Sequence, residues 1–209
     1  NRRASVDDMC DVLLVGSSVA YGQMAASERG WAQLLDAALR QRYRLRMTNA
    51  AVPGANTAAT MEELQFHLVR CKPCFVIISL SLANEGLLWA CEQTQARAVG
   101  SAFLEGLVKL AKEVQSSGAT PVIGNVYPNG AYERLHTEVL YRVHREIESW
   151  KDSYGWPSID FLAATDNGAG RWRDGAAADI GHPNTEGHQL MFSAVDISVF
   201  ASQGVAAPS

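Results

Sequence analysis

The hydrophobic positions of the chain alternate between continuous runs and sets at helical spacing. Short apolar runs or alternating stretches predict strands at 12–15, 45–50, 75–80, 121–127 and 158–161. Apolar positions at helical spacing, with helix start and stop signals such as Pro183 and Gly118, predict helices near 31–39, 58–69, 94–117, 132–154 and 183–200. The segment 163–181 is rich in Gly and Ala and is expected to be irregular.

Strand and helix follow each other in turn along the whole sequence. This order is typical of the α/β class and predicts a three-layer α/β/α sandwich built on a five-stranded parallel sheet. We expect a single domain over residues 1–209, because no linker, internal repeat or low-complexity tract divides the chain. The chain starts at Asn1 rather than Met, which is consistent with a domain excised from a longer protein.

The composition is that of an ordinary soluble globular protein, with 47% hydrophobic and 19% charged residues. The net charge of −4 gives no indication of nucleic-acid binding or of an anionic membrane surface as partner. No apolar run has the length of a transmembrane segment, and no signal peptide is visible. The sequence does not determine the cellular compartment of the protein.

Four cysteines are present, and two of them form a single Cys-x-x-Cys at Cys71 and Cys74. Without a second such pair, a structural zinc site is not expected. Cys10 and Cys74 each precede a predicted strand, so a disulfide from Cys10 to Cys71 or Cys74 is one alternative. Four unpaired thiols are the other.

The first predicted strand ends at Gly16, and two hydroxyl residues, Ser17 and Ser18, follow at once. Open α/β sheets place their ligand sites at the carboxyl ends of the strands. A serine there can expose its oxygen on a sharp strand-to-helix turn, as a nucleophile requires. The alternative is that one of the two serines only caps the next helix.

Three further segments fall at the same edge of the predicted sheet. They are 49–57, 81–85 and 179–183. Together with Ser18 they contain the groups that acyl transfer needs: His182 as a base, Asp179 to orient it, and Gly54 and Asn84 as donors to an oxyanion. Ser17 is a rival nucleophile, and Asp160, Asp166 and Asp174 are alternative partners of the base.

These segments resemble the SGNH hydrolases, also called GDSL esterases or lipases. The similar blocks are Gly16-Ser17-Ser18, the stretch 49–57 with Gly54, Ala83-Asn84-Glu85, and Asp179-Ile180-Gly181-His182-Pro183-Asn184. Their order and spacing match the family over nearly the whole chain. Three positions depart from it: Ser17 stands for the usual Asp, Leu82 for Gly, and Glu85 for Asp.

The resemblance implies a flavodoxin-like SGNH hydrolase fold and a serine esterase. In this interpretation Ser18, Asp179 and His182 are the catalytic triad, and Ser18, Gly54 and Asn84 form the oxyanion hole. No metal or organic cofactor is implied. The substrate is a small-molecule carboxylic ester, and the absence of a long apolar lid segment favours a short acyl group such as acetyl on a carbohydrate or other small alcohol.

Four alternatives remain open at this stage. The same triad serves lysophospholipases, thioesterases and acyltransferases, and a non-catalytic binding domain could keep the fold. A flavodoxin-like nucleotide binder is disfavoured, because no glycine-rich phosphate loop is present.

Other residues have simpler interpretations. Trp172, in the loop before Asp179, is the best candidate for substrate binding, although loop tryptophans more often anchor a loop to the core. We expect His188 at the surface or behind the site, and the helical His67, His136 and His144 in contact with solvent.

Overall fold

A computed structural model describes residues 11–201 and contains a five-stranded parallel sheet in the order β2-β1-β3-β4-β5. The strands are β1 (Val12–Gly16), β2 (Met47–Asn49), β3 (Phe75–Ser79), β4 (Thr120–Gly124) and β5 (Ser158–Ile159). β1 and β3 at the centre are fully buried, as their continuous apolar sequences require. Because all strands are parallel, the segments that follow β1, β2 and β3 meet at one edge of the sheet.

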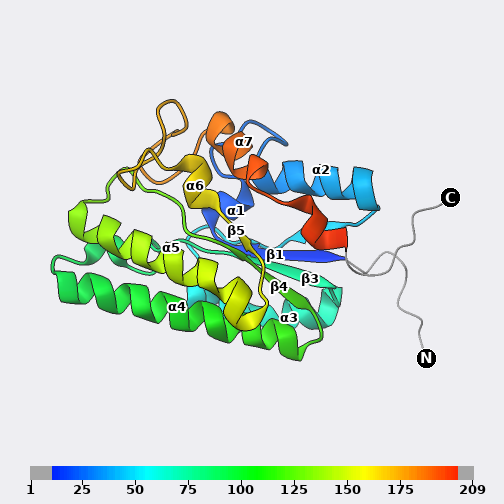
Figure 1. Ribbon diagram of the computed structural model, residues 1–209. Helices are drawn as coiled ribbons and strands as arrows, with labels where there is room; N and C mark the ends of the chain where they lie inside the picture. The colour runs from blue at the N-terminus through cyan, green and yellow to red at the C-terminus, as the bar shows by residue number, and fades with distance from the viewer. Residues whose placement is uncertain (1–10, 202–209) are drawn as a thin grey trace.

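Helices connect the strands and cover both faces of the sheet. They are α1 (Ser18–Tyr21), α2 (Trp31–Tyr43), α3 (Thr57–Cys71), α4 (Gln93–Ser116), α5 (Arg134–Tyr154), α6 (Phe161–Thr165) and α7 (Thr185–Ser193). Two short 3-10 helices complete the described part, η2 (Leu87–Trp89) and η3 (Ile197–Ala201). In Figure 1, α4 and α5 run below the sheet, and α2, α6 and α7 lie above it.

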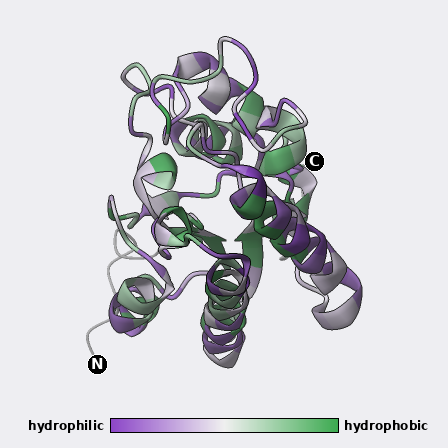
Figure 2. Ribbon diagram, turned by 90° about the vertical axis from the view of Figure 1, so that its left-hand side faces the viewer, coloured by the Kyte–Doolittle hydropathy of each residue, from purple (hydrophilic) through white to green (hydrophobic). Residues whose placement is uncertain are grey.

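Each face of the sheet has its own hydrophobic core. Residues of β1 alternate between the two: Leu13 and Val15 pack with α3, α4 and α5, whereas Val12 and Leu14 pack with α2, α7 and η3. Figure 2 shows the hydrophobic strands at the centre, between the two groups of helices. The predicted three-layer α/β/α sandwich with a five-stranded parallel sheet is thus confirmed.

Three parts of the secondary structure differ from the prediction. α1 and α6 are short helices that the hydrophobic pattern did not indicate. The last helix ends at Ser193 rather than near 200, and a separate 3-10 helix follows it. The Asp196 carboxylate accepts from the Ser198 N–H and hydroxyl, a local hydrogen-bonding pattern that competes with a continuous helix.

The prediction of a solvent-exposed ring was wrong for His136, and of the two alternatives for His188 the surface position was wrong. His188 is fully buried, where its Nδ1 accepts from the Trp31 N–H and its Nε2 donates to the Gln23 carbonyl. His136 is buried as well, and its Nδ1 accepts the Glu133 N–H at the start of α5. Both rings replace backbone partners that a helix end or loop would otherwise leave unsatisfied.

The cysteine question is answered only in part. No disulfide joins Cys71, Cys74 and Cys91 to one another. Cys10, on which the predicted pairing depends, lies outside the described residues. Within residues 11–201, none of the helices combines the length and apolar character needed to cross a membrane.

Candidate active site

The two adjacent serines after β1 have opposite environments. Ser17 is the N-cap residue of α1, and its side chain is fully buried without capping the helix. Its hydroxyl lies 3.3 Å from the hydroxyl of Tyr127. Ser18 is the first residue of α1 and is half-buried at the sheet edge. The turn therefore points Ser17 into the core and leaves Ser18 accessible.

Ser18, His182 and Asp179 form one hydrogen-bonded line. The Ser18 Oγ lies 3.0 Å from His182 Nε2, and His182 Nδ1 lies 2.9 Å and 3.0 Å from the two Asp179 carboxylate oxygens. An ionised carboxylate can only accept, so Nδ1 carries the proton and Nε2 is left to accept from the serine. This is the geometry in which a histidine can remove the proton of a hydroxyl nucleophile.

Backbone groups hold the Asp179 carboxylate in place. Its Oδ1 accepts from the N–H groups of Gly181 and His182 at 2.7 Å and 2.8 Å. Burial opposes ionisation, but these hydrogen bonds and the one from the His182 ring outweigh it and lower the pKa of Asp179. The carboxylate consequently stays charged well into the acid range.

A small hairpin carries Asp179 and His182 to Ser18. Ala177 and Pro183 pair across it, and the Ala178 N–H donates to the His182 carbonyl. Asn184 closes the hairpin by donating to the Gly175 carbonyl and then caps α7 by accepting from the Gly187 N–H. The sequence Asp-x-x-His-Pro-Asn thus contains both the hairpin and the start of the helix behind it.

The three predicted oxyanion donors lie on the segments that follow β1, β2 and β3 at one edge of the sheet. Within residues 11–201, the N–H groups of Ser18 and Gly54 have no hydrogen-bond acceptor. The Asn84 side-chain amide uses one hydrogen on the Ala55 carbonyl at 3.1 Å, which leaves its second hydrogen free. Gly54 has φ +83°, a conformation that favours glycine, and the space around it is open. Such donors can stabilise a negatively charged oxygen.

Glu85 joins the Gly54 and Asn84 loops, a role that the sequence did not indicate. Its carboxylate accepts from the Thr57 hydroxyl at 2.6 Å and from the Thr57 N–H at 3.1 Å. Thr57 begins α3 directly after the Gly54 loop. Asn49 plays a comparable structural part, because its amide donates to the Ala20 carbonyl and ties the second loop to α1.

Trp172 anchors the histidine loop. Its ring is buried and stacks on Tyr127 with centroids 5.9 Å apart, and its Nε1 donates to the Ile180 carbonyl. The geometry favours the anchoring role over the predicted contact with substrate. Tyr127, which no sequence motif marked, links Trp172 to Ser17 and so connects the two loops that carry His182 and Ser18.

Two of the three alternative carboxylates, and the two arginines that flank Trp172, have structural partners. Asp160 caps α6 and binds the His144 ring, and Asp166 accepts from the Tyr141 hydroxyl. Arg171 and Arg173 donate to backbone carbonyls of neighbouring loops. Among the predicted carboxylates, Asp179 is the one that contacts His182 within the described chain.

A cavity of about 350 Å³ lies beside Gly54, between the loop after β2 and α3. Small apolar residues make up much of its lining, which includes Gly16, Ala50, Val52, Pro53, Ala55 and Ala59. The lining also contains two glutamates and a histidine of α3, Glu62, Glu63 and His67. α3, which lines this cavity, and α7, which follows His182, cover opposite faces of the sheet.

One group of side chains in residues 11–201 has spacing suited to a metal ion. His144, Glu148 and Asp160 offer ligand atoms within 4.8 Å of one another. Each already has hydrogen-bond partners: His144 binds Asp160, and Glu148 accepts from Asn125 and Ser158. None of the three belongs to the loops around Ser18.

The family model for GDSL-like lipases and acylhydrolases matches residues 14–190, which include all four loop segments. The chain belongs to this family. As a GDSL hydrolase it shares the family's block order, with Ser17 in place of the usual Asp. Comparison with curated protein sequences gives no match.

Solved structures with the same fold include several esterases and lipolytic proteins. A lipolytic G-D-S-L protein from Veillonella parvula superposes with a TM-score of 0.71 at 19% identity, covering 91% of this chain and 98% of that one. An acetylxylan esterase from Geobacillus stearothermophilus gives 0.68 at 14% identity (90% and 94%). The esterase EstA from a Pseudoalteromonas species gives 0.64 at 19% identity (88% and 93%). At these identities the likeness shows the fold alone.

Proposed function

We propose that this GDSL hydrolase is a serine esterase that cleaves a carboxylic ester through an acyl-enzyme on Ser18. The observation that carries the proposal is the line from the Ser18 Oγ through the His182 ring to the Asp179 carboxylate, with hydrogen bonds of 2.9–3.0 Å. In this proposal, the N–H groups of Ser18 and Gly54 and the Asn84 amide supply the electrostatic stabilisation that ester cleavage needs.

In the first half of the reaction, the Ser18 Oγ attacks the ester carbonyl carbon while His182 Nε2 takes the hydroxyl proton. Asp179 stabilises the imidazolium that forms. The carbonyl oxygen becomes an oxyanion held by the Ser18 N–H, the Gly54 N–H and the free hydrogen of the Asn84 amide. The intermediate collapses, the C–O bond to the alcohol breaks, and the alcohol leaves with the proton from Nε2.

In the second half, water takes the place of the alcohol. His182 Nε2 removes a proton from the water as its oxygen attacks the acyl carbon. The same donors hold the second oxyanion. The bond to the Ser18 Oγ then breaks, the serine regains its proton from Nε2, and the carboxylic acid is released.

The positions of His182 and the apolar cavity support a proposal for where the two parts of the ester bind. The leaving oxygen must lie near His182 Nε2 to receive its proton. We infer that the acyl group enters the cavity beside Gly54, where small apolar residues are available to contact it. Its volume of about 350 Å³ is near the lower end for ligand sites, although it is more than an acetyl group fills. The support for a short acyl group such as acetyl is the absence of a long apolar lid segment in the sequence.

Labelling with a fluorophosphonate ester, followed by peptide mass spectrometry, tests the proposal. We expect one adduct, on Ser18, and its loss in the His182→Ala variant. Ser17→Ala is the matched control and keeps the adduct, because the Ser17 hydroxyl is buried against Tyr127. Folded protein with no labelled serine would instead support a non-catalytic binding domain.

A further inference from the structure

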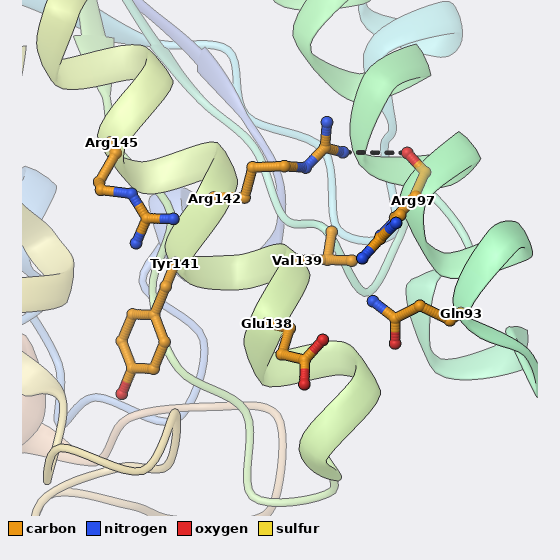
Figure 3. Close-up of a pocket in the computed structure, with 7 residues that line it drawn as sticks. All are labelled: Gln93, Arg97, Glu138, Val139, Tyr141, Arg142 and Arg145. Atoms are coloured by element: carbon orange, nitrogen blue, oxygen red, sulfur yellow. Dashed lines mark hydrogen bonds between the residues drawn. The ribbon is translucent and has the colours of Figure 1, made fainter.

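A groove separates the N-terminal halves of α4 and α5, outside the candidate active site. Its volume is about 580 Å³, and polar and charged side chains dominate its lining. Figure 3 shows that Arg97 on α4 and Arg142 on α5 extend toward each other across the groove, and that Arg145 follows one turn further along α5. Gln93 and Glu138 lie at the end nearer the helix starts.

Backbone and side-chain contacts fix Arg142 in this position. Its guanidinium donates to the Arg97 carbonyl at 3.0 Å and to the Ser101 hydroxyl at 3.4 Å. Gly100 makes room for it, since a Cβ at that position would come within 2.7 Å of Arg142 Nη2. The Arg142 Nε is buried and has no hydrogen-bond partner among the described residues. The guanidinium is therefore held in place by Arg97 and Ser101, while its Nε–H is unused.

The positive charge of the groove is not neutralised by the protein. Within residues 11–201, neither Arg97 nor Arg145 forms an ion pair or donates a hydrogen bond from its guanidinium. Glu138 is the one carboxylate in the lining, and it pairs with Arg134 on the outer side of α5. The groove therefore carries three arginines and one glutamate in a chain whose net charge is −4.

We propose that this groove is a binding site for a phosphate group carried by a ligand other than the ester. Guanidinium groups match the oxygens of phosphate with paired hydrogen bonds, and a doubly charged anion offsets the repulsion among the three arginines better than a singly charged one. The volume exceeds what one phosphate fills, so Gln93 and the Tyr141 ring are left to contact the organic part of the ligand.

The proposal is independent of the esterase assignment, because no residue of the groove belongs to the loops around Ser18. Isothermal titration with inorganic phosphate and pyrophosphate, at neutral pH and constant ionic strength, tests it. We expect saturable binding of pyrophosphate, with chloride at equal ionic strength giving none. Arg97→Gln and Arg145→Gln should each weaken binding about tenfold or more, since each removes a charged donor.

Arg145→Gln is the decisive variant, because the Arg145 side chain makes no hydrogen bond or ion pair in the described chain and its loss leaves the fold intact. Arg40→Gln on α2 is the matched control and should bind as the unmodified protein does. Vesicles of phosphatidylcholine with and without phosphatidic acid form a second arm. Binding to the phosphatidic acid vesicles would assign the phosphate to a lipid, and binding to pyrophosphate alone would assign it to a free ligand.

Two results would overturn the proposal. One is the absence of saturable binding by phosphate, pyrophosphate and the phosphatidic acid vesicles alike. The other is binding that Arg145→Gln and Arg97→Gln leave unchanged. Circular dichroism of each variant establishes that it is folded, and hydrolysis of an acetyl ester, measured in parallel, should stay unchanged in both.

Discussion

At the scale of single residues, the departure at Ser17 has a structural explanation. Most of the family has an Asp before the serine, and this chain has a hydroxyl that is fully buried against Tyr127. A carboxylate buried beside a neutral phenol would carry a large desolvation cost. Burial also raises the pKa of Tyr127, although hydrogen bonds to Ser17 and Ser81 oppose the rise, so the phenol stays neutral. Two neutral hydroxyls fit together here without any buried charge.

Asn84 provides the sharpest test of the oxyanion donors. Asn84→Ala removes a donor that acts most strongly on the developing oxyanion, so kcat should fall roughly 10²–10³-fold. KM should change little, because the amide contributes less to binding the neutral ester. Steady-state kinetics with an acetyl ester measure both constants.

Asn56→Ala serves as the control for this variant. It removes a side chain of the same type from the cap of α3, close to the same loop. It should cost stability of about 1 kcal/mol and leave kcat nearly unchanged. A rise in KM with an unchanged kcat for Asn84→Ala would contradict the proposed role.

At the scale of elements, α7 and the hairpin before it act as one unit. Gly187, in the first turn of α7, lies so close to the hairpin that a Cβ there would come within 2.2 Å of the Ala176 carbonyl oxygen. This contact explains why the motif that contains His182 continues to a glycine. The helix start is packed directly on the hairpin, so the position of His182 depends on the packing of α7.

The flank of α3 next to Gly54 should decide the acyl length that the protein accepts. Ala59 lines the apolar cavity and is exposed, so Ala59→Leu fills the cavity without displacing core atoms. We expect kcat/KM to fall several-fold for a hexanoyl ester and much less for an acetyl ester, since only the longer chain needs the filled space. A series of p-nitrophenyl esters measures the change.

Ala58→Leu is the matched control for this experiment. Ala58 is the exposed neighbour on α3 and does not line the cavity. It should leave the whole ester series unchanged. Equal effects of Ala58→Leu and Ala59→Leu, or faster turnover of long than of short acyl chains in the unmodified protein, would contradict the acyl assignment.

At the scale of the whole molecule, polar contacts join the helical layers across the sheet. The His144 ring on α5 lies 2.9 Å from the Asp160 carboxylate at the start of α6. The hydrogen bond to Asp160 raises the pKa of His144 against the effect of burial. Burial tends to raise the pKa of Asp160, but the hydrogen bonds from His144 and the Ala163 N–H lower it overall. Both shifts favour the ion pair.

The signs of these shifts predict how stability depends on pH. The raised pKa of His144 gives stability that is present below its ordinary value of 6.5 and is lost as pH rises through the raised value. The lowered pKa of Asp160 gives stability that is present above 3.8 and is lost as pH falls through the lowered value. The pair therefore stabilises the fold most in the weakly acidic range.

His144→Gln should reduce the free energy of unfolding more near pH 5.5 than near pH 8.5, by roughly 0.5–1 kcal/mol for this partly exposed pair. Urea unfolding at the two pH values measures the difference. His67→Gln is the control, because the His67 ring contacts Phe66 and forms no ion pair in the described residues. An equal loss at both pH values would contradict the assignment of the ion pair.

The sequence predicted the sheet well and the short elements poorly. Runs such as 75–80 are long enough for hydrophobicity alone to mark a buried strand. The four-residue α1 and the five-residue α6 are too short to show a helical period, and tertiary packing rather than propensity stabilises such pieces. The sequence could not place His188 either, because its two hydrogen-bond partners, at residues 23 and 31, are distant in the chain.

The sequence by itself determined the fold class, the family, and the four loop segments that surround Ser18, because block order and strand periodicity are local properties. Only the tertiary structure decided which serine is fully buried, how Glu85 and Tyr127 tie the loops together, and which arginines line one groove. Those outcomes depend on side chains far apart in the chain, and their distances are set by the packing of helices on the two faces of one sheet.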